Sequence, residues 1–264
     1  MSRRPPRSSL ALGFTLVVLV GTTVLGFFLL DTRGFEPGAA TAKLFRNLWS
    51  MVSSPQAKHF TFLEAMGALA QTFGLGILTT LMGGGAAIIL APFASRNLSS
   101  APAVAAIKAV VAFVRAVPTV IWVLIFAIGA GLGSVAAVVG MSFHSFGYLL
   151  KAYSETFEEL DGAVIEALKA SGATWPQIVL RAVIPSSSSG IVSWTFIRFE
   201  INFTNAVAMG AAAGAGGIGY DLFMASDFYF NIGEVGYITW LILAVAVCLE
   251  IGASRLKSSQ MTHR

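Results

Sequence analysis

Charged residues are scarce in this chain of 264 residues. Only 11% of the residues are Asp, Glu, Lys or Arg, whereas 56% are hydrophobic. A soluble domain of this size needs a charged exterior, but a chain surrounded by lipid can leave apolar side chains facing outward. The composition therefore argues against an ordinary soluble domain and predicts an all-α membrane protein.

Cysteine and catalytic signatures are also nearly absent. Cys248 is the single cysteine, so an intrachain disulfide is excluded. The chain has no G-x-x-x-x-G-K-[ST] sequence and no Gly-Lys pair, and it lacks H-E-x-x-H and G-x-S-x-G. We expect no enzyme activity, no metal site and no cofactor bound by this chain. Any ATP hydrolysis must take place on another subunit.

Apolar runs of about 20 residues, enough to cross a hydrocarbon core, recur along the chain. The first run follows the basic sequence SRRPPR and is too long for a cleavable signal peptide, so it predicts a retained anchor. An amphipathic helix over residues 40–51 suits the membrane surface. About six transmembrane helices are expected, at residues 10–30, 65–91, 109–130, 134–150, 188–210 and 235–251.

The distribution of basic residues predicts the topology. Most of the 17 Lys and Arg residues lie at the N-terminus, after the second run, after the fourth run and in the tail, while residues 211–234 carry none. By the positive-inside rule, both termini are cytoplasmic. We expect a cytoplasmic segment 1–9, an anchor 10–30, an extracytoplasmic segment 31–64, a core 65–254 and a cytoplasmic tail 255–264. The net charge of +4 reflects this asymmetry and does not indicate nucleic-acid binding.

The sequence GAGGIG has the G-x-G-x-x-G spacing of a dinucleotide-binding turn. It follows an apolar run without a strand signal, so nucleotide binding is excluded by context. Two interpretations remain, a glycine backbone that approaches a ligand and a loop that allows tight helix packing. They concern Gly214, Gly216, Gly217 and Gly219.

Residues 154–187 form the longest polar interruption between the late runs. Residues 162–170 have helix-forming composition, and Gly172 suits the position just after a helix. Thr174 and Gln177 form a T-x-x-Q capping box, and Pro185 is expected to stop the second helix. The segment predicts a cytoplasmic helix-turn-helix.

This hairpin resembles the E-A-A-x3-G-x9-I-x-L-P pattern of ABC importer permeases in Glu166-Ala167-Leu168, Gly172 and Ile184-Pro185. Leu168, Ala182 and Ile184 depart from the pattern by apolar exchanges. The resemblance implies the type I permease fold, with residues 154–187 as the loop that couples to an ATPase. It assigns the contact to Glu166, Ala167, Gly172, Ala173 and Pro185.

The resemblance extends over most of residues 65–251. The sequence VRAVP is similar to the R-[AS]-x-P entrance of this superfamily, and IRFEINFTNAVAMG followed by GAGGIG resembles the phosphonate branch. Thr204 stands where that branch often has a basic residue. The cargo implied is a phosphonate or a related oxyanion such as phosphite or phosphate.

The resemblance also implies partners in the bilayer of the bacterial inner membrane. These are two ATPase subunits that bind ATP and magnesium, a second permease chain, identical or a paralogue, and an extracytoplasmic binding protein of the phosphonate type. The alternative is an ion-coupled secondary transporter. Glu200 is the only deeply placed carboxylate, and no internal repeat is evident.

Polar residues within the predicted spans are the candidates for the translocation pathway. Arg198 and Glu200 lie about ten residues into a span, where a charge costs about 2.5–3.5 kcal/mol. Arg198 is expected either to serve an anion pathway while Glu200 holds it, or to form a structural ion pair. Asn202 and Thr204 would supply neutral hydrogen bonds, and His144 would hydrogen-bond within the bundle.

Overall fold

The computed structural model describes residues 7–31 and 36–261, and this part of the chain is helical without any strand. The all-α membrane fold expected from the composition is confirmed. The helices, with π-turns written η, are α1 (Arg7–Leu29), α2 (Pro37–Ser53), α3 (Phe62–Ala94), α4 (Ala101–Ala116), α5 (Thr119–Ala130), α6 (Ser134–Glu158), α7 (Gly162–Ala170), α8 (Trp175–Ile178), η1 (Val179–Val183), α9 (Ile184–Ser186), α10 (Ser188–Ala213), α11 (Ile218–Phe223), η2 (Met224–Phe228) and α12 (Ile232–Met261).

The chain divides into two compact units, residues 1–48 and 49–264. In the first unit, residues 10–29 of α1 form an apolar helix long enough to cross a membrane, as expected for the anchor. The helix expected at the membrane surface is α2, which is longer than residues 40–51. The predictions for residues 1–6, 32–35 and 262–264 lie outside the described residues.

Four described helices, α1, α3, α6 and α12, are long and apolar enough to span a membrane, and a bent pair would make a fifth span. The bent pair is α4 and α5, which meet at 87°. The span expected over 109–130 is thus divided between two helices instead of forming one continuous helix. Pro118 disfavours helical backbone at the preceding residue, and Val117 is extended, with ψ 123°. The remaining expected span is α10, a 26-residue helix that is less apolar because it carries Arg198, Glu200 and Asn202.

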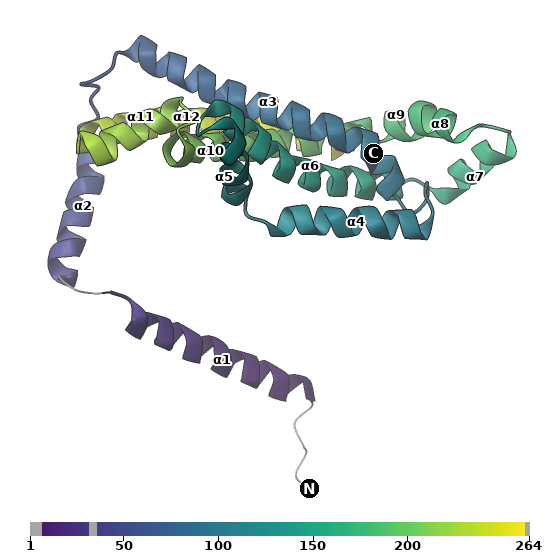
Figure 1. Ribbon diagram of the computed structural model, residues 1–264, viewed down its shortest axis with the longest axis horizontal. Coiled ribbons are helices and arrows are strands. Elements are labelled where there is room, and N and C mark those ends of the chain that lie inside the picture. Colours follow the sequence, from purple (N-terminus) through teal and green to yellow (C-terminus); the bar gives the residue numbers. More distant parts are fainter. Residues whose placement is uncertain (1–6, 32–35, 262–264) are drawn as a thin grey trace, which may run out of the picture. The chain divides into compact units, whose positions relative to one another are not determined.

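The core of the second unit is built around α6, which packs against α3, α4, α5 and α10 (Figure 1). Close packing of α3 on α6 depends on Gly83. A Cβ atom at this position would lie 2.7 Å from the Cβ of Ser145 and 2.9 Å from the backbone nitrogen of Phe146. The two helices therefore meet almost backbone to backbone, and side chains on α3 and α6 come within reach of α10.

The GAGGIG sequence forms the turn from α10 to α11. Gly214 ends α10 in the left-handed conformation, and Gly216 and Gly217 also have positive φ. Gly219 packs so tightly against the Val207 carbonyl that a side chain would overlap it. The described contacts of this turn match the helix-packing interpretation of the sequence.

Candidate functional site

A buried arginine lies at the centre of the candidate site. Arg198 of α10 is only 2% exposed and is the largest fully buried side chain among the described residues. Its Nε donates to the Ser145 hydroxyl at 3.1 Å, and its Nη2 lies 3.1 Å from His144 Nδ1. The guanidinium also lies over the Tyr148 ring, 5.1 Å from the ring centroid. Since arginine can only donate, His144 accepts through Nδ1 and is the neutral imidazole.

Asn202 extends these contacts to a third helix. The Ser145 hydroxyl donates to Asn202 Oδ1 at 2.9 Å, and Asn202 Nδ2 donates to the Thr80 hydroxyl of α3 at 2.9 Å. Thr80 in turn donates to the Gly76 carbonyl at 2.7 Å. We call the resulting set of residues from α3, α6 and α10 the polar cluster: Thr80, His144, Ser145, Tyr148, Arg198 and Asn202.

The polar cluster lies near the middle of the membrane-crossing part of the fold, because His144 and Ser145 are central in the 25-residue α6. Sequence reasoning identified Arg198, Asn202 and His144 but missed Thr80, Ser145 and Tyr148. The available signal was the spacing of Ser145 and Tyr148, one and four residues after His144, which places all three near one side of a helix.

Glu200 and Thr204 do not belong to the polar cluster. Residues two apart on a helix point in different directions, so the expected Arg198–Glu200 ion pair is absent, and Glu200 does not hold Arg198. The Glu200 carboxyl lies near Glu250 of α12. The exposed Thr204 hydroxyl donates to the Glu200 carbonyl of its own helix at 3.3 Å.

The polar cluster holds the positive charge of Arg198 without a negative charge beside it. Within the described residues, the partners of Arg198 are neutral, and no carboxylate contacts it. A guanidinium has five N–H donors, and only Nε and Nη2 make hydrogen bonds here. A buried, uncompensated cation with unused donors is suited to bind an anion, because charge-assisted hydrogen bonds would offset its desolvation.

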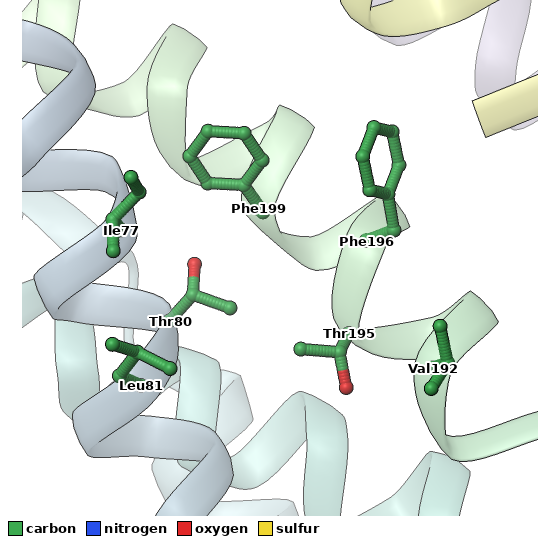
Figure 2. Close-up of a pocket in the computed structure, with 7 residues that line it drawn as sticks. All are labelled: Ile77, Thr80, Leu81, Val192, Thr195, Phe196 and Phe199. Atoms are coloured by element: carbon green, nitrogen blue, oxygen red, sulfur yellow. The ribbon is translucent and has the colours of Figure 1, made fainter. Parts of the chain in front are cut away.

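A neighbouring pocket between α3 and α10 has a different character (Figure 2). Its volume is about 310 Å³, and only Thr80 and Thr195 in its lining have polar side chains. With no charged group, it offers little to a small anion. The pocket is lined by Ile77, Thr80, Leu81, Val192, Thr195, Phe196 and Phe199.

The helix-turn-helix over residues 154–187 is present. Helix α7 has the predicted bounds, and Gly172 after it has φ +85°. The Thr174 backbone N–H donates to Gln177 Oε1 at 2.8 Å, which forms the predicted capping box. Sequence reasoning missed Asp161, which caps α7 by accepting from the Ala163 N–H at 2.9 Å.

The hairpin buries Ile165 and Ile178 in the core and leaves both polar and apolar residues exposed. Glu166, Ala167 and Gly172 are exposed, whereas Ala173 is half-buried against the core. Trp175 Nε1 donates to the Leu98 carbonyl at 2.8 Å, which fixes the hairpin to the connection between α3 and α4. In Figure 1, α7 and α8 lie at one end of the second unit, and α11 lies at the other.

Pro185 does not stop the helix, contrary to expectation. It is the central residue of α9, and the break before α10 falls at Ser187. Proline lacks an N–H and clashes with the carbonyl four residues earlier. The backbone widens into the π-turn η1, Val179–Val183, immediately before Pro185, which accommodates this carbonyl without ending the helix.

A bundle of apolar helices with a polar centre and a helix-turn-helix at one end fits a membrane component of a transport system. Residues 83–253 match the family described as "Binding-protein-dependent transport system inner membrane component". The chain belongs to this family. The resemblance seen in the hairpin sequence is therefore confirmed.

The chain is similar in sequence to two bacterial permeases. The chain is 30% identical over 236 residues to "Phosphate-import permease protein PhnE" of Mycolicibacterium smegmatis, covering 88% of this chain and 43% of that protein. It is 33% identical over 183 residues to "Phosphite transport system permease protein PtxC" of Stutzerimonas stutzeri, covering 69% of this chain and 66% of that protein. The chain thus spans less than two thirds of the length of either relative.

Among solved structures, the fold is similar to a chain of the MetNI methionine ABC transporter in an inward-facing conformation. The TM-score is 0.63 at 20% identity, and the match covers 74% of this chain and 95% of that chain. The similarity places this chain in the type I ABC importer permease fold.

Proposed function

We propose that this chain is the transmembrane permease subunit of an ATP-driven importer for a small oxyanion, namely phosphonate, phosphite or phosphate. The observation that carries the proposal is Arg198, a buried cation near mid-membrane that no described carboxylate neutralises. The names of the phosphate-import and phosphite relatives support the same class of cargo.

The polar cluster would hold the charge of Arg198 in a fixed direction. Ser145 and His144 fix two of its nitrogens, and the Tyr148 ring covers one face of the guanidinium. The remaining N–H groups would bind an oxyanion. Asn202 acts indirectly in this scheme, because it positions Ser145 rather than contacting the anion.

Coupling to ATP hydrolysis would occur through the hairpin. Exposed Glu166, Ala167 and Gly172, together with Ala173 and Pro185, would contact an ATPase subunit that binds ATP and magnesium. One hairpin per chain would serve one ATPase, so a second permease chain would complete the assembly with two ATPases. A binding protein of the phosphonate type would deliver the cargo from outside.

This assignment requires the hairpin and both termini to be cytoplasmic and residues 211–234 to be outside. Single cysteines at positions 174 and 227, both exposed, can test the orientation in a Cys248→Ala background. A membrane-impermeant thiol reagent should label position 227 in intact cells and spare position 174. The opposite labelling pattern would reject the hairpin's coupling role.

The anion role of Arg198 can be tested by uptake into proteoliposomes that contain the complete transporter and its binding protein. Arg198→Gln should reduce ATP-dependent uptake of phosphite or phosphate by about tenfold to a hundredfold, as expected from the loss of charge-assisted hydrogen bonds. Arg198→Lys, which keeps the charge, should retain more activity. Glu200→Gln is the matched control, because Glu200 lies outside the polar cluster.

Assembly is monitored by the thermal stability and subunit stoichiometry of the purified complex. Wild-type uptake by an assembled Arg198→Gln complex would reject the proposal. If Arg198→Gln and Glu200→Gln reduce uptake equally, the interpretation of the two residues as a structural ion pair is favoured instead. Uptake driven by an ion gradient without ATP would favour the secondary-transporter alternative.

A further inference from the structure

A second group of cations surrounds a pocket between α4 and α6. The pocket has a volume of about 270 Å³, and its lining includes Arg96, Lys108, Arg115 and Lys151. Glu155 is the only carboxylate in this lining. This volume is at the small end of ligand pockets, so the pocket suits a compact ligand.

The cations lie on helix faces that turn toward each other. Lys108 and Arg115 are seven residues apart on α4, and Lys151 and Glu155 are four residues apart on α6, so each pair lies on one side of its helix. Arg96 follows the end of α3. The pocket is thus formed by three separate segments of the chain that meet at one place.

Two of the four cations form ion pairs with acids, and Glu158 also lies within electrostatic reach of Arg96. Lys151 pairs with Glu155 at 3.1 Å, and Lys108 pairs with Glu158 at 2.9 Å. The Arg96 and Arg115 guanidinium groups make no hydrogen bond or ion pair within the described part of the chain. The pocket therefore carries excess positive charge and two sets of unused planar donors.

Arg115 lies in the last turn of α4, and its side chain is exposed. A Cβ atom at Gly147 would lie 3.0 Å from Arg115 Cγ, so the stem of Arg115 rests against the middle of α6. Arg115 also lies within electrostatic reach of His144 in the polar cluster. Arg115 thus extends toward the polar cluster from the α4–α6 pocket.

We infer that the α4–α6 pocket is a binding site for a phosphoryl-type oxyanion, held by the guanidinium groups of Arg96 and Arg115. Arginine is suited to this role because its planar donors match the oxygens of such anions. The anion is either free in solution or the headgroup of an anionic phospholipid. The inference extends the proposed function. It rests on that function because phosphate is chosen as the probe from the proposed class of cargo.

Binding is measured on the whole transporter in nanodiscs, without ATP or binding protein, so transport is not required. In phosphatidylcholine discs, radiolabelled inorganic phosphate should bind to wild type. Arg96→Gln/Arg115→Gln should weaken this binding by about tenfold or more. Arg46→Gln, which removes an exposed arginine of α2, is the matched control and should bind as wild type does.

A second arm distinguishes the two sources of the anion. Phosphatidylglycerol is added to the discs, and retained lipid is counted by native mass spectrometry. A free-anion site binds phosphate whether or not this lipid is present. A headgroup site retains phosphatidylglycerol in wild type and loses it in Arg96→Gln/Arg115→Gln. Either pattern supports the site, whereas unchanged phosphate binding and unchanged lipid retention in the double variant would overturn it.

A measurement on wild type avoids any folding defect of the double variant. Phenylglyoxal modifies accessible arginines, and phosphate or phosphatidylglycerol should slow its reaction with Arg96 and Arg115 but not with Arg46. Equal rates with and without both anions would also overturn the inference. If Arg198→Gln still binds phosphate, the α4–α6 pocket is a different site from Arg198. The pocket proposal and the proposed function can therefore fail separately.

Discussion

The hairpin and the polar cluster are stabilised in different ways. In the hairpin, capping bonds join residues two or three apart, such as Asp161 to Ala163 and Thr174 to Gln177. In the polar cluster, the bonds join residues 57 apart, from Ser145 to Asn202, and 122 apart, from Thr80 to Asn202. The helix ends and the turn of the hairpin therefore depend on local backbone preferences, whereas the polar cluster depends on the packing of three helices. Substitutions in the two regions should change different properties.

The largest effect is expected where α3 meets α6. Gly83→Val would place atoms inside the contact with Ser145 and the Phe146 backbone, which cannot move without separating the helices. Overpacking of this kind costs about 3 kcal/mol or more, and the polar cluster would be disrupted with it. Thermal unfolding of the purified complex measures the loss.

Gly85→Val is the matched control, because a Cβ atom at Gly85 meets nothing within 4 Å. The control should be close to wild type in stability. Similar unfolding temperatures for the two variants would show that the α3–α6 contact does not limit stability.

A smaller loss is expected from Asn202→Ala. The substitution removes a buried amide, so the Thr80 hydroxyl keeps only its helix carbonyl partner and the Ser145 hydroxyl loses its acceptor on α10, at a cost of about 1–3 kcal/mol. It also frees Ser145 to reorient, so uptake should fall along with stability. Thr204→Ala on the same helix removes an exposed hydroxyl and should change stability by less than about 0.5 kcal/mol. If Thr204→Ala lowers the unfolding temperature as much as Asn202→Ala does, the polar cluster does not contribute the expected stability.

The smallest effect on bundle stability is expected in the hairpin. Gly172→Val strains a residue with φ +85° by about 1–2 kcal/mol, which misplaces the turn but leaves the helices of the core in contact. Transport-coupled ATP hydrolysis should fall while the unfolding temperature of the bundle stays near that of wild type. Wild-type uptake by this variant would reject the coupling role.

Gly162→Ala provides the matched control for the hairpin. Gly162 opens α7, and a Cβ atom there meets nothing within 4 Å, so alanine should be tolerated. A loss of ATP hydrolysis in Gly162→Ala equal to that in Gly172→Val would point to general sensitivity of the hairpin rather than to its turn geometry.

The sequence allowed prediction of features that depend on neighbouring residues. The bounds of α7, the turn at Gly172 and the capping box at Thr174 follow from local preferences, and all are confirmed. Pro118 could also have predicted the helix bend at Val117. The continuous hydrophobicity of residues 109–130 led to the prediction of a single helix instead. At Pro185, the general rule that proline ends a helix was wrong because a π-turn absorbed the clash.

The candidate site was only partly predictable for a different reason. Composition marked Arg198 as exceptional within an apolar span, but it could not identify the side of α10 that faces α6. Glu200 was assigned to Arg198 because the two are close in sequence, although they point in different directions. Thr80 became identifiable only after the packing of α3 on α6 through Gly83 was known.

The fixed charge of Arg198 has an electrostatic consequence for ions other than the cargo. At about 7 Å and an effective dielectric constant of about 20, a unit positive charge raises the energy of another cation by about 2 kcal/mol. A pathway past Arg198 would therefore oppose the leak of sodium ions and protons, much as an arginine in a selective pore does. The permease would protect the membrane potential even while its route is open to anions. A pH-sensitive dye inside liposomes can check this, because Arg198→Gln should collapse an imposed proton gradient faster than wild type.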